Sequence, residues 1–151
     1  MTDGPPVPGR LLAVDWGEKR FGIARSDEGR VIAQPLTTLT RRAGKRFPMQ
    51  ELIALVHEHH ATGVLVSLPL AEDGSEGDPA RAARELAQEI ASRTNLPVDL
   101  WDERFTTARA LRAVREMGGR TRGRKEDVDA LAATLLLQHY LDAKRARTDA
   151  G

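Results

Sequence analysis

Three acidic residues, Asp15, Glu103 and Asp129, stand where carboxylates could act together. Asp15 follows an apolar run, Leu11 to Val14, which predicts a central strand with Asp15 at the rim of a sheet. Glu103 and its neighbour Asp102 end the stretch PVDLWDE, which predicts a second strand. Because side chains alternate along a strand, only one of these two acids can face a ligand on a given side.

Asp129 lies in the first turn of a predicted final helix, on a face shared with Ala132, Ala133 and Leu136. That face is apolar, so the carboxylate points toward buried surface, where a charge is costly unless it is paired or bound to a cation. Asp127 is a nearby alternative that projects from a different face of the helix.

The chain has no cysteine, and its clustered histidines, His57, His59 and His60, cannot all share one helix face. Three carboxylates from two strand ends and one helix therefore predict a site for a hard cation, Mg²⁺ or Mn²⁺. Two such ions, about 4 Å apart, can activate water and stabilise the leaving oxygen in phosphodiester hydrolysis.

Each acid also has an ordinary structural explanation. Asp15 could pair with Lys19 or Arg20, Glu103 could pair with Arg104, and Asp129 could favour its helix N-terminus. Arg20 and Arg104 could instead hold phosphate with two hydrogen bonds each. Gly17 and Gly22 would let the backbone approach a phosphate or a neighbouring strand closely, although turn formation explains them as well.

Basic residues are concentrated in one part of a chain whose net charge is only +1. Residues 104–125 carry eight basic residues and one acid, a local balance of +7, so the rest sums to −6. Such a block suits an anionic partner such as a nucleic-acid backbone, and a solvated helix face is the alternative. Its densest part, RTRGRK, supplies Arg120, Arg122, Arg124 and Lys125 as a predicted clamp on the substrate backbone.

The elements that must position these residues follow from apolar periodicity. A meander of strands is expected at 10–16, 21–26 and 31–36, and it is followed by strands at 63–70 and 97–103. Helices are expected at 48–60, from 79, at 107–117 and at 126–143. This order predicts an α/β domain with a mixed sheet, parallel where strands alternate with helices.

The length of 151 residues fits one compact domain, predicted at 10–143 between tails at 1–9 and 144–151. The N-terminus lacks the apolar core of a signal peptide, and no apolar run is long enough to span a membrane. We therefore expect a cytoplasmic protein with no membrane partner.

Four stretches together resemble the YqgF family, also called RuvX, over about Leu11 to Asp142. They are VDWGEKRFGIARSD, SLPLAEDGSEG, DERFTT and KEDVDALAATLLLQHYLD, in that order. The family comprises ribonuclease H-like nucleases described as Holliday junction resolvases and as nucleases that mature the 5′ end of precursor 16S rRNA.

The resemblance implies a ribonuclease H-like fold with a mixed five-stranded sheet flanked by helices. It implies catalysis and metal binding by Asp15, Glu103 and Asp129, with two Mg²⁺ or Mn²⁺ ions. Expected partners are structured RNA, branched DNA and ribosomal precursor particles. Processing of rRNA is the first choice, and junction resolution, which would need a homodimer in place of a monomer, is the second.

Two other function classes fit part of the pattern. Sugar kinases and actin-like ATPases use a similar Asp-x-Gly turn, but they need a second such domain and a second phosphate loop, which this chain lacks. A ribosome-assembly factor that binds RNA without cleaving it could use the same basic block, although the three acids weigh against it.

Overall fold

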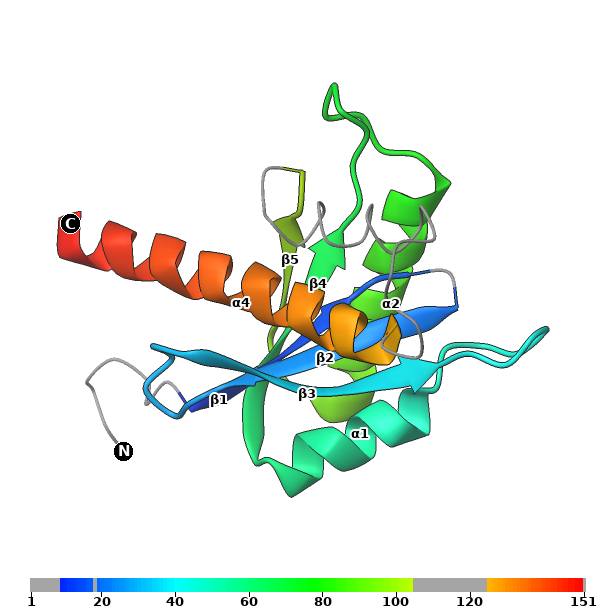
Figure 1. Ribbon diagram of the computed structural model, residues 1–151, viewed down its shortest axis with the longest axis horizontal. Coiled ribbons are helices and arrows are strands. Elements are labelled where there is room, and N and C mark those ends of the chain that lie inside the picture. Colours follow the sequence, from blue (N-terminus) through cyan, green and yellow to red (C-terminus); the bar gives the residue numbers. More distant parts are fainter. Residues whose placement is uncertain (1–8, 18, 105–124, 151) are drawn as a thin grey trace.

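Five strands form one mixed sheet in the order β3-β2-β1-β4-β5 (Figure 1). The computed structural model describes residues 9–17, 19–104 and 125–150, and within the last segment the side chains of 128–146. The strands are β1 (Arg10–Asp15), β2 (Arg20–Ser26), β3 (Ala33–Thr40), β4 (Ala61–Leu68) and β5 (Val98–Asp102). The first three pair antiparallel, and β1, β4 and β5 pair parallel. The predicted α/β architecture with a mixed sheet is confirmed.

The described helices cover both faces of this sheet, and β1 contributes to the core on each side. Helices α1 (Met49–Glu58) and α2 (Asp78–Thr94) pack in one core with Leu12 and Val14. Helix α4 (Lys125–Ala150) packs in a second core with Leu11 and Ala13. The alternation of side chains along β1 explains why four consecutive apolar residues are all buried.

The third strand begins at Ala33 and not at residue 31 as predicted. Asp27 Oδ1 accepts hydrogen bonds from the backbone N–H groups of Val31 and Ile32, at 2.7 and 2.9 Å, so these two N–H groups are engaged just after the turn and not in the sheet. These bonds, first from Ile32 and then from Val31, lower the pKa of Asp27. The strand therefore starts later, and it continues to Thr40.

The final helix also differs from its prediction, because it runs to Ala150 and not to residue 143. Its last turns extend beyond the sheet (Figure 1). The predicted helix at 107–117 lies outside the described residues, and the domain limits 10–143 remain a prediction. Among the described residues, no helix has the length and apolar content needed to cross a bilayer.

Helix α4 approaches the backbone of β2 at Gly22. A Cβ atom added to Gly22 would lie 1.9 Å from the Asp129 carbonyl oxygen and 3.1 Å from the Ala130 nitrogen. Both neighbours are backbone atoms, which cannot rotate away as a side chain could. Gly22 is therefore required by a close approach between strand and helix, and not by the approach to a phosphate or a neighbouring strand that the sequence suggested.

We predict that Gly22→Ala destabilises the fold by about 1–3 kcal/mol or more, because the added methyl group forces the helix away from the strand. Urea denaturation of the two proteins measures the difference. Gly29→Ala is the matched control, since a Cβ atom there meets only side-chain atoms at 3.4 Å or beyond. Equal stability of the Gly22 variant and the parent would contradict the close approach.

Candidate active site

Asp15 and Glu103 lie at the same edge of the sheet, at the carboxyl ends of parallel strands β1 and β5. Asp15 is 2% exposed and Glu103 is 4% exposed. Along β1, every second side chain, that of Leu11, Ala13 and then Asp15, faces α4. Glu103 lies two residues after Trp101, which packs in the same core. Both carboxylates are therefore directed to the face that α4 covers.

The side chain of the neighbouring acid, Asp102, points to the opposite face of the sheet, and Arg104 binds it. Arg104 Nε lies 2.9 Å from Asp102 Oδ2, and its Nη2 lies 2.8 Å from the same oxygen. Arg104 Nη1 also donates to the Glu72 carbonyl at 3.1 Å, which ties the end of β5 to the loop before α2. The hydrogen bond with Asp102 raises the pKa of Arg104. The structure thus shows Arg104 pairing with Asp102, whereas the sequence suggested Glu103 as its ionic partner.

Asp129 lies on α4 opposite the end of β1. Its side chain is 4% exposed, and its Oδ2 accepts a hydrogen bond from Arg20 Nε at 2.9 Å. Gly22, which the Asp129 backbone contacts, is the cross-strand partner of Asp15. Directly opposed residues point to the same face of a sheet, so Asp15 and Asp129 are close neighbours.

Strand β4 lies between β1 and β5, so two strand spacings, about 10 Å, separate Asp15 from the line of β5, and Glu103 lies two residues beyond Trp101, which is level with Asp15 across the sheet. Ser67 occupies the intervening position on the α4 side, two residues after Leu65, and is fully buried. Its Oγ accepts a hydrogen bond from the Trp16 backbone N–H at 2.6 Å. Ser67 is absent from the motif-based predictions, and the only signal for it is a hydroxyl inside the apolar run GVLVSLPL.

The donor chemistry of the three acids fits a hard divalent cation, because all are carboxylates and all are nearly inaccessible to bulk water. Within the described residues, however, no three acidic or histidine side chains converge into a compact metal cluster. The fold brings the three predicted acids to one edge and one face. It does not bring them into one closed set of ligands.

The predicted substrate contacts are only partly described. Arg20 lies beside Asp129 at the start of β2, with 23% of its side chain exposed. Arg120, Arg122 and Arg124 lie outside the described residues. Lys125 is the first residue of α4, four residues before Asp129, and its side chain is not described.

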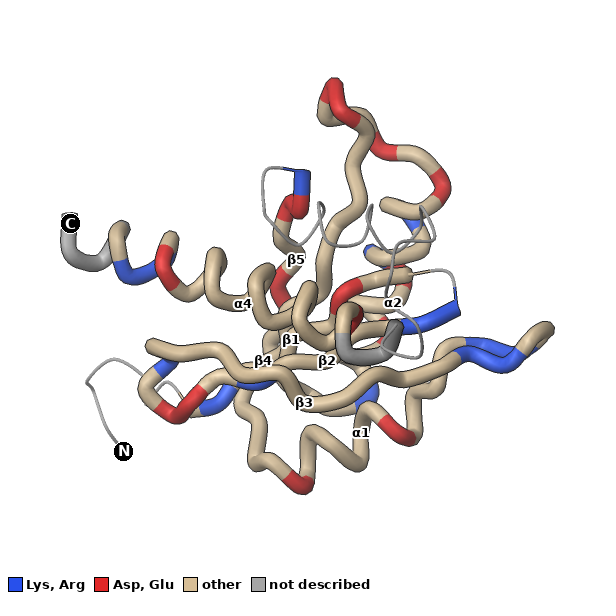
Figure 2. Tube along the Cα trace, viewed as in Figure 1, with Lys and Arg blue, Asp and Glu red and all other residues tan. Residues whose placement is uncertain are grey.

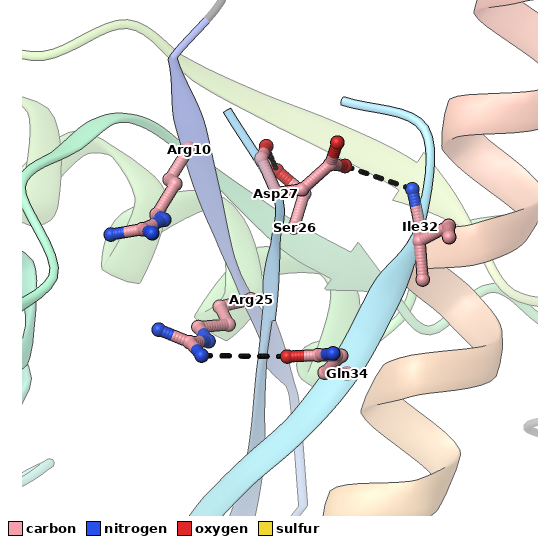
Figure 3. A pocket seen from close by; sticks show the side chains of 6 residues that line it. All are labelled: Arg10, Arg25, Ser26, Asp27, Ile32 and Gln34. Carbon is pink, nitrogen blue, oxygen red and sulfur yellow. Dashed lines mark hydrogen bonds between the residues drawn. The ribbon is translucent and has the colours of Figure 1, made fainter. Parts of the chain in front are cut away.

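A separate hollow lies at the opposite end of β1 and β2, lined by Arg10, Arg25, Ser26, Asp27, Ile32 and Gln34 (Figure 3). Arg25 donates to Gln34 and lies 3.1 Å from His59 Nδ1. Asp27 is held in the turn that precedes β3. The polar groups of this hollow are engaged in local structure, and the acids lie at the other end of the strands.

Several known proteins are similar to this chain. The sequence model of the family "RuvX: Holliday junction resolvase" matches residues 9–143. A protein of Koribacter versatilis named "Putative pre-16S rRNA nuclease" is 38% identical over 144 residues, which cover 95% of this chain and 94% of the relative. A protein of the same name from Frankia casuarinae is 40% identical, with 93% of this chain and 70% of the relative covered.

Among solved structures, RuvC of Thermus thermophilus in complex with a Holliday junction substrate aligns with a TM-score of 0.56 at 15% identity. The alignment covers 91% of this chain and 96% of RuvC. Another RuvC structure from Thermus thermophilus gives a TM-score of 0.52. These similarities confirm the ribonuclease H-like fold that the sequence motifs implied. On the family match and the identity to its relatives together, the chain belongs to the RuvX family.

Proposed function

We propose that this protein is a cytoplasmic nuclease that hydrolyses phosphodiester bonds in structured nucleic acid, with the 5′ end of precursor 16S rRNA as its substrate. The observation that carries the proposal is the placement of three buried carboxylates, Asp15, Glu103 and Asp129, at one edge of a RuvC-like sheet. Relatives named as pre-16S rRNA nucleases support the choice of substrate.

In this proposal Asp15, Glu103 and Asp129 hold Mg²⁺ or Mn²⁺, with two ions in the complete site. A divalent cation bound there supplies an activated water and stabilises the leaving oxygen. Arg20 fixes the orientation of the Asp129 carboxylate through its Nε. Burial under α4 keeps bulk water away from the carboxylates, which strengthens their interaction with a cation.

Resolution of Holliday junctions is the second candidate, favoured by the description of the family model and by the fold shared with RuvC. Symmetric cleavage of a junction requires two active sites and therefore a homodimer. Cleavage assays on precursor rRNA, on four-way DNA junctions and on single strands, each with Mg²⁺ or Mn²⁺, separate the two. Binding of RNA without cleavage of any substrate would instead favour an assembly factor for ribosomal precursor particles.

We predict that Asp15→Asn abolishes cleavage and leaves the fold intact, because the substitution removes a ligand charge and keeps the size of the side chain. The loss should be at least about 100-fold in kcat, the scale on which a lost catalytic group acts. Single-turnover cleavage at saturating Mg²⁺ measures it, with circular dichroism to check the fold. Parental turnover in a folded variant would remove Asp15 from the active site.

We predict that Asp129→Asn weakens the thermal stabilisation given by Mn²⁺, because the variant lacks one metal-binding charge. Arg20→Gln is the matched variant, since it breaks the same ion pair from the other side and leaves the three carboxylates in place. Melting temperatures with chelator and with Mn²⁺ distinguish the roles of Asp129. If the two variants respond equally to Mn²⁺, Asp129 serves only the ion pair, and Asp127→Asn then tests the neighbouring acid.

We predict that neutralising Arg120, Arg122 and Arg124 together as Gln weakens nucleic-acid binding and flattens its dependence on salt. For every phosphate that the variant no longer neutralises, the negative slope of log K against log salt should move closer to zero by about 0.7–0.9. Fluorescence anisotropy over a KCl series measures the slope. A slope equal to that of the parent would mean that these arginines are solvated and do not touch the substrate.

A further inference from the structure

A second basic segment connects β3 to α1. We call it the β3-α1 loop, residues 41–47, with the sequence RRAGKRF. It contains Arg41, Arg42, Lys45 and Arg46, and the chain has no acidic residue between Glu28 and Glu51. This segment is distinct from the basic block at 104–125 and is fully described in the structure.

Both ends of the β3-α1 loop are fixed to the body of the protein. At one end, the Arg41 guanidinium lies 5.5 Å from the Trp16 ring centroid and 5.3 Å from that of Phe21, within the range of cation–π attraction. The Arg41 backbone N–H donates to the Lys19 carbonyl at 2.7 Å. At the other end, Phe47 packs edge-on against Phe21 at a centroid distance of 4.6 Å. The loop is therefore held in place before any ligand binds.

Between these anchors, Arg42, Lys45 and Arg46 are all exposed. The Lys45 N–H donates to the Arg42 carbonyl at 2.9 Å, and Gly44 adopts a left-handed φ of 75°, so the loop makes a tight turn. Among the residues the structure describes, none of these three cations forms an ion pair. Their charges are available to an anionic partner.

The loop begins at the edge of the sheet that carries the acids. Thr40, the last residue of β3, is the cross-strand partner of Arg20, which binds Asp129. Two strand spacings separate β3 from β1, so the start of the loop is about 10 Å across the sheet from the line of Asp15. Figure 2 shows the basic positions of the loop on the same side of the molecule as the basic start of β2.

We propose that the β3-α1 loop, together with Lys19, binds the phosphate backbone of the nucleic-acid strand that flanks the cleaved bond. This inference rests on the proposed function, because it extends the path of the same substrate. Exposed cations held between two anchored ends suit binding to phosphate. Arginine and lysine are among the side chains that supply most contacts to phosphate oxygens in complexes with nucleic acid. The loop adds affinity and sets the direction of the strand, and the acids perform the cleavage.

The test measures binding of a fluorescently labelled RNA hairpin with a single-stranded 5′ tail, by anisotropy over a KCl series. The Asp15→Asn background keeps the RNA intact. We expect R42Q/K45Q/R46Q to bring the negative slope of log K against log salt closer to zero by about 2 to 3, because three phosphates that each account for about 0.7–0.9 are no longer neutralised. In the otherwise unaltered enzyme, the same triple change should raise KM for this RNA and leave kcat unchanged.

The control R93Q/K144Q/R145Q also removes three exposed positive charges, from the last turn of α2 and the far part of α4. It should keep the slope of the parent. Two results would overturn the inference and leave the proposed function standing. One is a loop variant with the same slope as the parent, and the other is a control whose slope flattens as much as that of the loop variant. Absence of any salt-dependent RNA binding by the parent would overturn both.

Discussion

The contact between helix α4 and strand β2 at Gly22 is the constraint on which the candidate site depends. The helix can lie this close only because no side chain separates the Gly22 backbone from the Asp129 carbonyl. The same contact places the Asp129 side chain within hydrogen-bond distance of Arg20, and beside the residue that pairs across the strands with Asp15. Leu136, Leu137 and Leu141, all nearly inaccessible, hold the rest of the helix on the sheet and keep this geometry fixed.

Burial of three carboxylates on one face works against stability, because charged groups lose hydration there and like charges repel. The rest of the fold offsets this cost with apolar packing on both sides of β1. A set of residues that opposes the local rules of folding is characteristic of a functional site. Asp15 and Glu103 stand at the ends of strands and Asp129 stands on a helix, whereas the cations of the β3-α1 loop lie between a strand and a helix.

Most of the sheet could be predicted because β1 is uniformly apolar and the later segments alternate between strand and helix periods. The inward direction of the Asp129 side chain could be predicted because Ala132, Ala133 and Leu136 share its helix face and are apolar. Pairing between distant residues could not be predicted. Arg20 and Asp129 are 109 positions apart, and nothing in the sequence around either residue identifies the other as its partner. The late start of β3 depends on the Asp27 side chain bonding to its own backbone, which competes with strand formation and leaves the apolar pattern unchanged. The β3-α1 loop is visibly basic in the sequence, but the rings that fix its two ends are distant in the chain and could not be predicted from it.

In the proposed function, Arg20 would serve both the acids and a phosphate. A guanidinium has five N–H donors, and the ion pair with Asp129 uses the one on Nε. The side chain is 23% exposed, so part of it reaches solvent at the edge where the β3-α1 loop begins. The remaining donors, on the two terminal nitrogens, form the planar fork that binds phosphate oxygens in pairs. Lysine at this position would supply a charge but could not hold Asp129 through one nitrogen while presenting two others outward. Arg20 therefore lies between the buried carboxylates and the start of the β3-α1 loop, and in the proposed function it would keep Asp129 oriented while a phosphate binds on its outer side.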